Sequence, residues 1–171
     1  MTDRAWLPAD WAHPLRVRLT DAHHLRPVGP ADIDLDLAAI RSTRERLWAA
    51  FGQAWGWPRA DLTREDELDN LIHHAAETEA HESFVYGLFD AAETAMVGTV
   101  YVDPPAKVGA DADISWWVAE SAVGGPIEAA LDAFVPAWIT GSWPFANPRF
   151  VTRDLSWAEW LTLPDLLEEN A

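Results

Sequence analysis

Two consecutive runs of β-branched and aromatic residues constrain the fold of this chain more than any other feature. Residues 83–89 and 95–102 have this composition, and the polar residues 90–94 connect them. Two such runs on either side of a short polar connection are typical of a β-hairpin. The sequence therefore predicts a tight antiparallel pair of strands at the centre of the chain.

Further strands and helices are predicted on both sides of this hairpin. Strand patterns occupy residues 15–19, 24–28, 114–118 and 149–153, and helical patterns occupy residues 30–40, 42–51, 63–81 and 126–138. Capping boxes are predicted at Ser42, Thr63 and Ser156, and Pro136 is expected to kink or shorten its helix. Because helices are inserted between strands, the order predicts an α/β fold with a mixed sheet.

Composition limits the domain count and the compartment. The 171 residues suit one domain, here an irregular arm over 1–14 and a single domain over 15–171. The chain has no cysteine, no apolar run approaching the about 20 residues of a membrane span, and no secretory signal pattern at its first residues. These features predict a soluble, cytoplasmic protein that does not bind membranes.

The charge balance argues against nucleic acid as a partner. Twelve Lys and Arg face 28 Asp and Glu, so the formal net charge is −16. Such a surface repels a phosphate backbone, and no concentrated basic patch is evident. An acidic surface can attract a cationic amine, although a general acidic bias that aids solubility explains the same composition.

One helix carries a pattern that invites a metal hypothesis. His73, Glu77 and His81 follow each other at intervals of four residues. Their helix has a predicted buried face of apolar residues, Leu68, Leu71, Ile72, Ala75 and Ala76. His73 and His81 would stand about 12 Å apart along the axis, too far for one ion, and all three should point to water. No metal site is therefore predicted, although two of them could bind an ion with ligands from elsewhere.

Four segments in order resemble the GNAT superfamily of N-acetyltransferases. They are Leu25-Arg26-Pro27-Val28 with Pro30-Ala31-Asp32, Met96-Val97-Gly98-Thr99-Val100, Asp113-Ile114-Ser115-Trp116-Trp117-Val118, and Gly124-Gly125 before an amphipathic helix. The resemblance covers residues 24 to 155. It implies an acyl-CoA N-acyltransferase fold, with a central mixed β-sheet flanked by helices, that uses acetyl-CoA as co-substrate.

The resemblance also implies a cofactor site. The strand edge at Trp117, Val118 and Ala119 would bond the pantetheine arm, and the turn at Val123, Gly124, Gly125, Pro126 and Ile127 would hold the phosphates. A glycine turn at a helix N-terminus offers backbone N–H groups and a partial positive charge to an anion.

Several residues depart from the family pattern. Ser121 stands where a polar or basic residue leads the turn, Pro126 replaces the last small residue, and Glu120 and Glu128 flank the site. No Lys or Arg occurs between Lys107 and Arg149, so cations for the phosphates must come from elsewhere. The chain also ends soon after its fifth family-like strand, which suggests a divergent, C-terminally shortened member with altered cofactor binding or none.

The catalytic candidates follow from the same resemblance. Asp113 stands at the head of the fourth strand, where the family commonly has an acidic residue, and Tyr101 is a candidate acid. An ordinary solvated Asp and a tyrosine that packs across strands are the alternatives for these residues. Trp116 and Trp117, adjacent on a strand, must face opposite sides of the sheet.

The leading hypothesis is direct transfer of an acetyl group from acetyl-CoA to a small-molecule amine acceptor. A catalytically inactive GNAT-like binding module, which could form a homodimer, is the first alternative. A metal-binding helical protein built around His73, Glu77 and His81 is the second.

Overall fold

The computed structural model of this chain describes residues 5–166. Its strands form one sheet in chain order: β1 (Val17–Thr20), β2 (His23–Pro27), β3 (Phe84–Asp90), β4 (Met96–Asp103), β5 (Ala112–Val118) and β6 (Pro148–Phe150). Neighbouring strands are antiparallel from β1 to β5, whereas β5 and β6 are parallel. The predicted central hairpin is β3–β4, and the predicted mixed sheet is confirmed.

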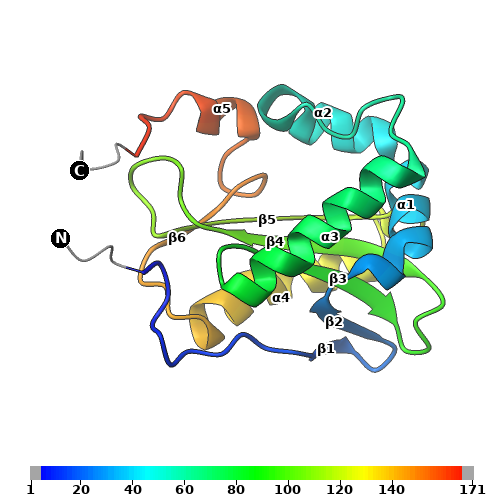
Figure 1. Cartoon of the computed structure of the whole chain (residues 1–171), viewed down its shortest axis with the longest axis horizontal. Coiled ribbons are helices and arrows are strands. Elements are labelled where there is room, and N and C mark those ends of the chain that lie inside the picture. The colour runs from blue at the N-terminus through cyan, green and yellow to red at the C-terminus, as the bar shows by residue number, and fades with distance from the viewer. Residues whose placement is uncertain (1–4, 167–171) are drawn as a thin grey trace.

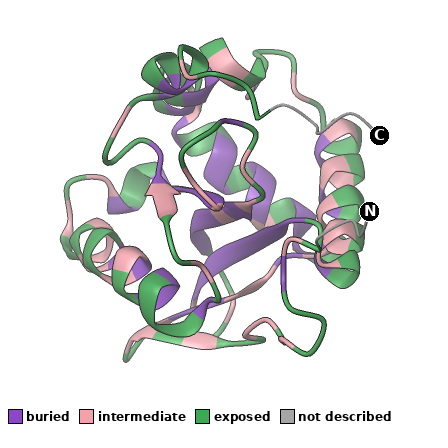
Figure 2. Ribbon diagram, turned by 90° about the vertical axis from the view of Figure 1, so that its left-hand side faces the viewer, coloured by how far each residue is buried: buried purple, intermediate pink, exposed green. Residues whose placement is uncertain are grey.

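Helices cover both faces of the sheet (Figure 1). On one face lie η1 (Pro30–Asp32), α1 (Ile33–Ser42), α2 (Arg44–Trp55), α3 (Arg64–Ala80) and α5 (Trp157–Leu161). On the other lies α4 (Pro126–Ser142), which follows the short turn η2 (Glu120–Ala122). Each face therefore has its own apolar cluster, and Figure 2 shows how burial concentrates in the strands between them.

Alternation along β5 separates its two tryptophans as predicted. Trp116 packs in the cluster beneath α4, and Trp117 packs in the cluster beneath α1 and α2. Each indole N–H has a partner on its own side: Trp116 Nε1 donates to Asp132 at 2.8 Å, and Trp117 Nε1 donates to the Tyr101 hydroxyl at 3.0 Å. The strand thus anchors both layers of the fold.

Residues 5–14 form no helix or strand, but their apolar side chains contact the α4 face of the core. Leu7 is buried, and Trp6 and Trp11 pack beside it. Trp6 Nε1 also donates to the Asp111 carbonyl at 2.8 Å. The tryptophans of this segment therefore serve packing of the domain.

The helix boundaries correct two sequence expectations and confirm others. The capping box predicted at Ser42 is wrong, because Ser42 is the last residue of α1 and its hydroxyl donates to the Ala39 carbonyl at 2.6 Å. The boxes at Thr63 and Ser156 are confirmed. Pro136 does not shorten α4, which continues to Ser142.

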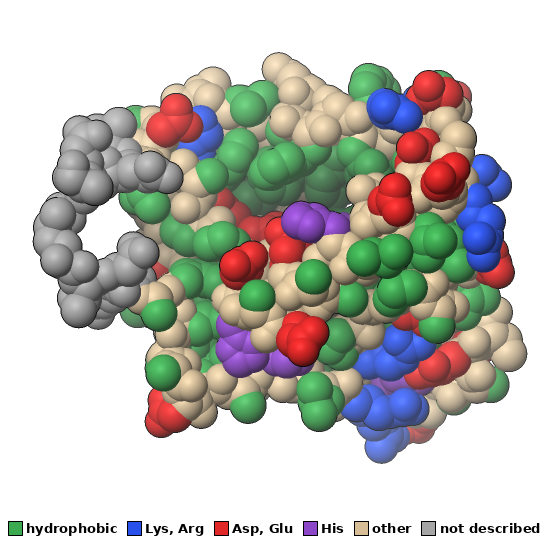
Figure 3. All heavy atoms as spheres, viewed as in Figure 1, with side chains coloured by type: hydrophobic (Ala, Val, Ile, Leu, Met, Phe, Trp, Pro, Cys, Tyr) green, Lys and Arg blue, Asp and Glu red, His purple; other side chains and the backbone are tan. Residues whose placement is uncertain are grey.

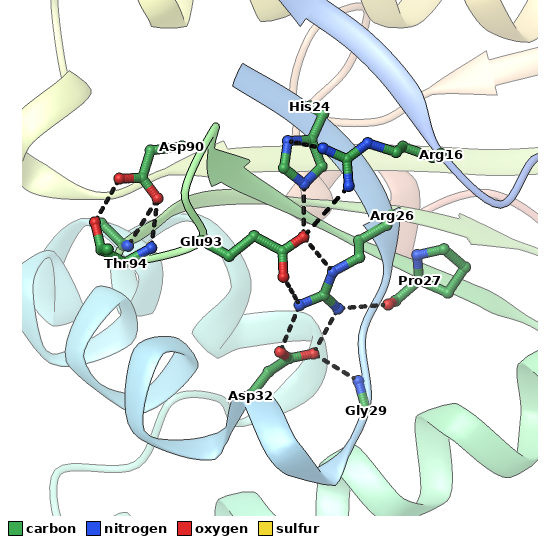
Figure 4. Close-up of polar contacts among 10 residues, drawn as sticks. Arg16, His24, Arg26, Pro27, Gly29, Asp32, Asp90, Glu93 and Thr94 are labelled. Carbon is green, nitrogen blue, oxygen red and sulfur yellow. Dashed lines mark hydrogen bonds and ion pairs between the residues drawn. The ribbon is translucent and has the colours of Figure 1, made fainter. Parts of the chain in front are cut away.

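A network of ion pairs joins β2, η1 and the hairpin loop (Figure 4). Arg26 binds both oxygens of Asp32, at 2.8 and 3.0 Å, and both oxygens of Glu93, at 2.8 and 2.9 Å. His24 Nε2 lies 2.7 Å from the same Glu93 carboxylate. Donors from Arg26 and His24 lower the pKa of Glu93 to about 2. The first family-like motif therefore fixes the hairpin loop against the entry to α1.

Candidate functional site

The two strands β5 and β6 diverge after a short parallel pairing. β6 pairs only with Ala112–Ile114 of β5, and a last backbone hydrogen bond runs from Val151 N to Ile114 O at 2.8 Å. The chain then turns away at Thr152, whose N–H donates to the Leu155 carbonyl at 2.7 Å. Within residues 5–166, no strand pairs with the outer edge of β5 beyond Ile114. The second half of this edge therefore offers free backbone N–H and C=O groups.

A groove of about 740 Å³ lies along this free edge. Its walls come from α2, the second half of β5, the start of α4 and the loop after β6, and they comprise Thr43, Arg46, Leu47, Ala49, Ala50, Phe51, Trp116, Trp117, Val118, Glu128, Asp132, Thr152 and Arg153. Of the three strand-edge residues predicted to bond the pantetheine arm, Trp117 and Val118 line this groove. The third, Ala119, is buried and donates its N–H to the Val97 carbonyl at 2.8 Å.

The glycine turn precedes α4, its residues 123–127 do not line the groove, and it satisfies most of its own amides. Val123 N donates to the Glu120 carbonyl at 3.2 Å, and Gly125 N donates to the Ala122 carbonyl at 3.1 Å. Gly124, with φ of 71°, donates its N–H to the Glu128 carboxylate. Pro126 has no N–H, and the first hydrogen bond of α4 runs from Ala129 N to Gly125 O. Helix geometry leaves the N–H groups of Ile127 and Glu128 as the donors at this end.

Two arginines supply positive charge that the sequence did not place here. Two arginines line the groove: Arg46 of α2, which precedes β5 in the chain, and Arg153 of the loop after β6, which follows it. Arg153 Nε lies 3.8 Å from the Asp154 carboxylate. The stretch without Lys or Arg between 107 and 149 is thus compensated by residues far away in the chain. Local spacing contains no signal for this.

A second cavity of about 380 Å³ opens on the face of the sheet that α2 and α3 cover. It is lined by polar residues of α3, by the sheet and by four aromatic side chains. They are Glu67, Asn70, His73, His74 and Glu77; Ser83, Val85, Tyr101, Asp103 and Ser115; and Phe51, Trp55, Trp57 and Trp157. Figure 3 shows a hollow on this face, with acidic and histidine side chains among hydrophobic ones. Phe51 lines both cavities.

Three carboxylates in this cavity have different surroundings. Glu77 lies 3.2 Å from His73 Nε2 and 3.3 Å from His74 Nδ1. Asp103 accepts a hydrogen bond from the Ser83 hydroxyl at 2.6 Å, and burial raises its pKa to about 7. Glu67 is buried and accepts from the Asn70 amide at 3.2 Å. The cavity is therefore acidic, which suits a cationic amine.

The orientation of α3 corrects the sequence expectation for this helix. Its buried residues are Glu67, Leu71 and Thr78, whereas Ile72 is 50% exposed. The predicted apolar face is therefore wrong by part of a turn, and Glu77 lines a cavity instead of pointing to water. Leu71 is buried and Leu68 packs against the core as predicted, but Ile72 is exposed because the inward face also takes Glu67 and Thr78.

The three residues of the metal hypothesis do not come together. His81 caps α3 with φ of 58°, and its Nε2 lies 3.2 Å from His13 Nδ1. His73 and Glu77 remain on the helix beside the second cavity. Across the described part of the chain, no group of three or more His, Cys, Asp or Glu residues could hold a metal ion. The mixed sheet also contradicts a purely helical protein.

The two predicted catalytic residues lie in different settings. Tyr101 lines the second cavity, and burial raises the pKa of its hydroxyl, so the hydroxyl stays protonated. Asp113 is 4% exposed and lines neither cavity. Its oxygens accept from Arg149 Nε at 2.7 Å and from Trp160 Nε1 at 3.1 Å. The contacts of Asp113 join β5, β6 and α5.

Solved structures of acetyltransferases are similar to this fold. One is a ribosomal-protein-S5-alanine acetyltransferase from Vibrio fischeri, with 13% identity, a TM-score of 0.56, and 74% of this chain and 68% of that chain covered. Another, from Salmonella typhimurium, modifies the N-terminal serine of ribosomal protein L7/L12, with 15% identity, a TM-score of 0.57, and 74% and 70% covered. A third is the microcin C7 self-immunity acetyltransferase MccE with acetyl-CoA and AMP, with 12% identity, a TM-score of 0.57, and 76% and 70% covered.

These structures contradict one expectation. The predicted small-molecule amine acceptor is wrong, because two of the similar proteins are named for acetylating ribosomal proteins. No curated protein sequence matches this chain. Separately, no helix over residues 5–166 has the length and apolar character to cross a membrane.

The family itself follows from the sequence match. Residues 23–165 match the acetyltransferase (GNAT) domain, which is most of the chain. The diverging strands β5 and β6, the groove along β5 and the glycine turn before α4 lie within this range. The chain belongs to the GNAT acetyltransferase family.

Proposed function

We propose that this protein transfers the acetyl group of acetyl-CoA to an amino group at the terminus of a protein or peptide chain. The observation that carries the proposal is the meeting of two cavities at one point of β5. Ser115 lines the acidic cavity, the next residues Trp116 and Trp117 line the groove, and Phe51 lines both. A thioester held in the groove and an amine held in the cavity would meet there.

The groove suits the coenzyme in three respects. The free edge of β5 offers backbone groups to the amides of a pantetheine arm. Arg46 and Arg153 offer guanidinium groups to phosphates. The N–H groups of Ile127 and Glu128 point out of the start of α4, where an anion is favoured. Against these stands the carboxylate of Glu128, which has to leave Gly124 before a phosphate can take its place.

The acceptor side suits a terminal ammonium group. Glu67, Glu77 and Asp103 supply negative charge or protonatable oxygens, and aromatic faces such as Trp55 and Trp57 can contact a cation. The cavity lies open on the surface shown in Figure 3, so a chain end can enter while the rest of the chain stays outside. The similar structures named for ribosomal proteins support a protein acceptor.

The Tyr101 hydroxyl is the candidate acid of this reaction. It lines the cavity, stays protonated, and accepts the Trp117 indole N–H at 3.0 Å. From there it can donate its proton to the departing sulfur of coenzyme A. For Asp113, the hydrogen bonds from Arg149 and Trp160 support a positioning role for β5 in place of the predicted proton transfer.

The test uses acetyl-CoA and octapeptides that begin with Ala or Ser. Transfer releases a free thiol, and the protein has no cysteine that would add to the thiol signal. Mass spectrometry locates the acetyl group. The same peptides with acetylated amino termini serve as controls and should release no thiol. Thiol release that does not depend on a free amino terminus would count against the proposal.

A non-catalytic binding module is the second candidate. It is favoured by the two acids in the groove, since Glu128 occupies the Gly124 amide and Asp132 accepts the Trp116 indole N–H. Calorimetric titration with acetyl-CoA distinguishes the two functions when it is combined with the peptide assay. Binding of acetyl-CoA without transfer to any free-terminus peptide would support the module.

A further inference from the structure

A pair of buried carboxyl groups stands at the wall of the acidic cavity. Asp36 comes from α1 and Glu67 comes from α3, and they are 5% and 4% exposed. Glu67 lines the cavity, whereas Asp36 is not among the lining residues. Burial, the charge of Glu67 and a hydrogen bond to Glu67 raise the pKa of Asp36 well above its ordinary value. The raised pKa favours the protonated Asp36 carboxyl, which can then donate a hydrogen bond to Glu67.

No cation neutralises this pair. Among residues 5–166, neither Asp36 nor Glu67 forms an ion pair with Lys, Arg or His. Asp36 Oδ2 has no hydrogen-bond partner, and Glu67 accepts only from the Asn70 amide at 3.2 Å apart from its contact with Asp36. A buried carboxyl pair of this kind costs stability, and apolar residues would join α1 and α3 more favourably.

The other acidic groups of the site already have partners. Glu77 faces His73 and His74, Asp103 accepts from Ser83, and Asp113 accepts from Arg149 and Trp160. Glu67 lines the cavity, is buried, and forms no ion pair with Lys, Arg or His within residues 5–166. It lines the same cavity as Tyr101 and the aromatic side chains, which is the cavity proposed for the acceptor.

We propose that Glu67 binds the terminal ammonium group of the acceptor and takes its proton, and that Asp36 is a positioning residue that holds the Glu67 carboxylate by donating a hydrogen bond to it. This inference rests on the proposed function and identifies the general base of the proposed acetyl transfer. It assigns the base to α3, where the family resemblance places no catalytic residue.

The proton and bond balance is complete with these groups. The ammonium gives one proton to the Glu67 carboxylate, and the neutral nitrogen forms a bond to the acetyl carbon. The bond between that carbon and sulfur breaks, and its electron pair leaves with the sulfur. The sulfur takes a proton from the Tyr101 hydroxyl. The nitrogen then gives its second proton to the Tyr101 oxygen, which restores the hydroxyl. The proton on Glu67 then passes to water.

The kinetic experiment compares Glu67→Gln, Asp36→Asn and the matched surface control Glu79→Gln in the peptide assay. We expect Glu67→Gln to lower kcat for the Ala and Ser octapeptides by about 100-fold or more, the usual contribution of a general base. The calorimetric Kd for acetyl-CoA should not change, which also shows that the variant is folded. Glu79→Gln should behave as the wild type. A Glu67→Gln variant with more than a third of the wild-type kcat overturns the proposal.

Asp36→Asn tests the positioning role through a pH profile. Asparagine keeps the shape but donates a weaker hydrogen bond to Glu67, so the acid limb of kcat should move upward by about one pH unit. The other titratable groups around the pair are Asp32, Tyr101, Asp103, Glu77 and the two cavity histidines. The pH profile of the control variant Glu79→Gln shows their contribution to kcat. An unshifted limb overturns the role of Asp36.

An NMR titration distinguishes a failure of this inference from a failure of the proposed function. Carbon-13 NMR of labelled Asp and Glu carboxyls should show two coupled titrations for Asp36 and Glu67 in the wild type and one in Asp36→Asn. The Ala and Ser octapeptides should shift the Glu67 resonance, and their N-acetylated twins should not. A shift without acetyl transfer would overturn the proposed function alone. Transfer without any shift at Glu67 would overturn this inference alone.

Discussion

The carboxylate of Glu128 accepts a hydrogen bond from the backbone N–H of Gly124. Glu128 lies in the first turn of α4, and Gly124 lies in the turn that precedes this helix. A side chain of the protein therefore occupies an amide that the family resemblance assigns to a phosphate. The turn has the geometry of an anion site and carries its own anion.

Removing this anion should strengthen coenzyme binding. In Glu128→Ala the Gly124 amide is freed and one negative charge leaves the groove, so the Kd for acetyl-CoA should fall about tenfold, the equivalent of one charge-assisted hydrogen bond. Calorimetric titration measures it, with Glu79→Ala on the exposed side of α3 as control. Equal affinity in the two variants would show that Glu128 does not compete with the phosphates.

Arg46 and Arg153 should supply the positive charge of the groove. Each single change to Ala should raise the Kd for acetyl-CoA about tenfold, because a charge-assisted contact to phosphate is lost. Raising the salt concentration should weaken binding by the wild type more than binding by the double variant. Arg18→Ala on β1, far along the sheet, is the control. Identical salt dependence in the double variant and the wild type would remove these arginines from the site.

Gly98 should be required for the close approach of β4 and β5. A Cβ at this position would stand 2.6 Å from the carbonyl oxygen of Trp117, which backbone movement alone can relieve. Gly98→Ala should therefore lower the free energy of unfolding by about 1–3 kcal/mol and weaken acetyl-CoA binding. Gly29→Ala, where a Cβ meets nothing within 4 Å, should change the stability little. Urea unfolding compares the two, and equal stabilities would contradict the prediction.

The Glu93 network should stabilise the fold at neutral pH and fail in acid. The folded-state pKa of Glu93 is about 2, below its ordinary value of 4.5, so its contribution is fully present above pH 4.5. It is lost as the pH falls from 4.5 towards 2. Glu93→Gln should therefore be less stable than the wild type at pH 7, and this difference should shrink below pH 4.5. Unfolding at several pH values measures it; a difference independent of pH would place the stabilisation elsewhere.

The local elements could be predicted from the sequence because their causes are local. Residue types in 83–89 and 95–102 define the hairpin, and the hydrogen bonds at Thr63 and Ser156 define two helix starts within four residues. The alternation that separates Trp116 from Trp117 is likewise a property of one strand. The order of these elements was sufficient to indicate the family.

Pairing between distant residues was decided only by the tertiary structure. The inward face of α3 carries Glu67 because Asp36 of α1 and the cavity lie against it, and no pattern within α3 records that neighbour. Arg46 reaches the groove across more than sixty residues of chain, and Glu128 reaches Gly124 through the first turn of α4. The sequence alone determined the strands, the helices and their order, because those depend on neighbouring residues. Burial and electrostatics of the site depend on which elements pack together, and packing fixed them.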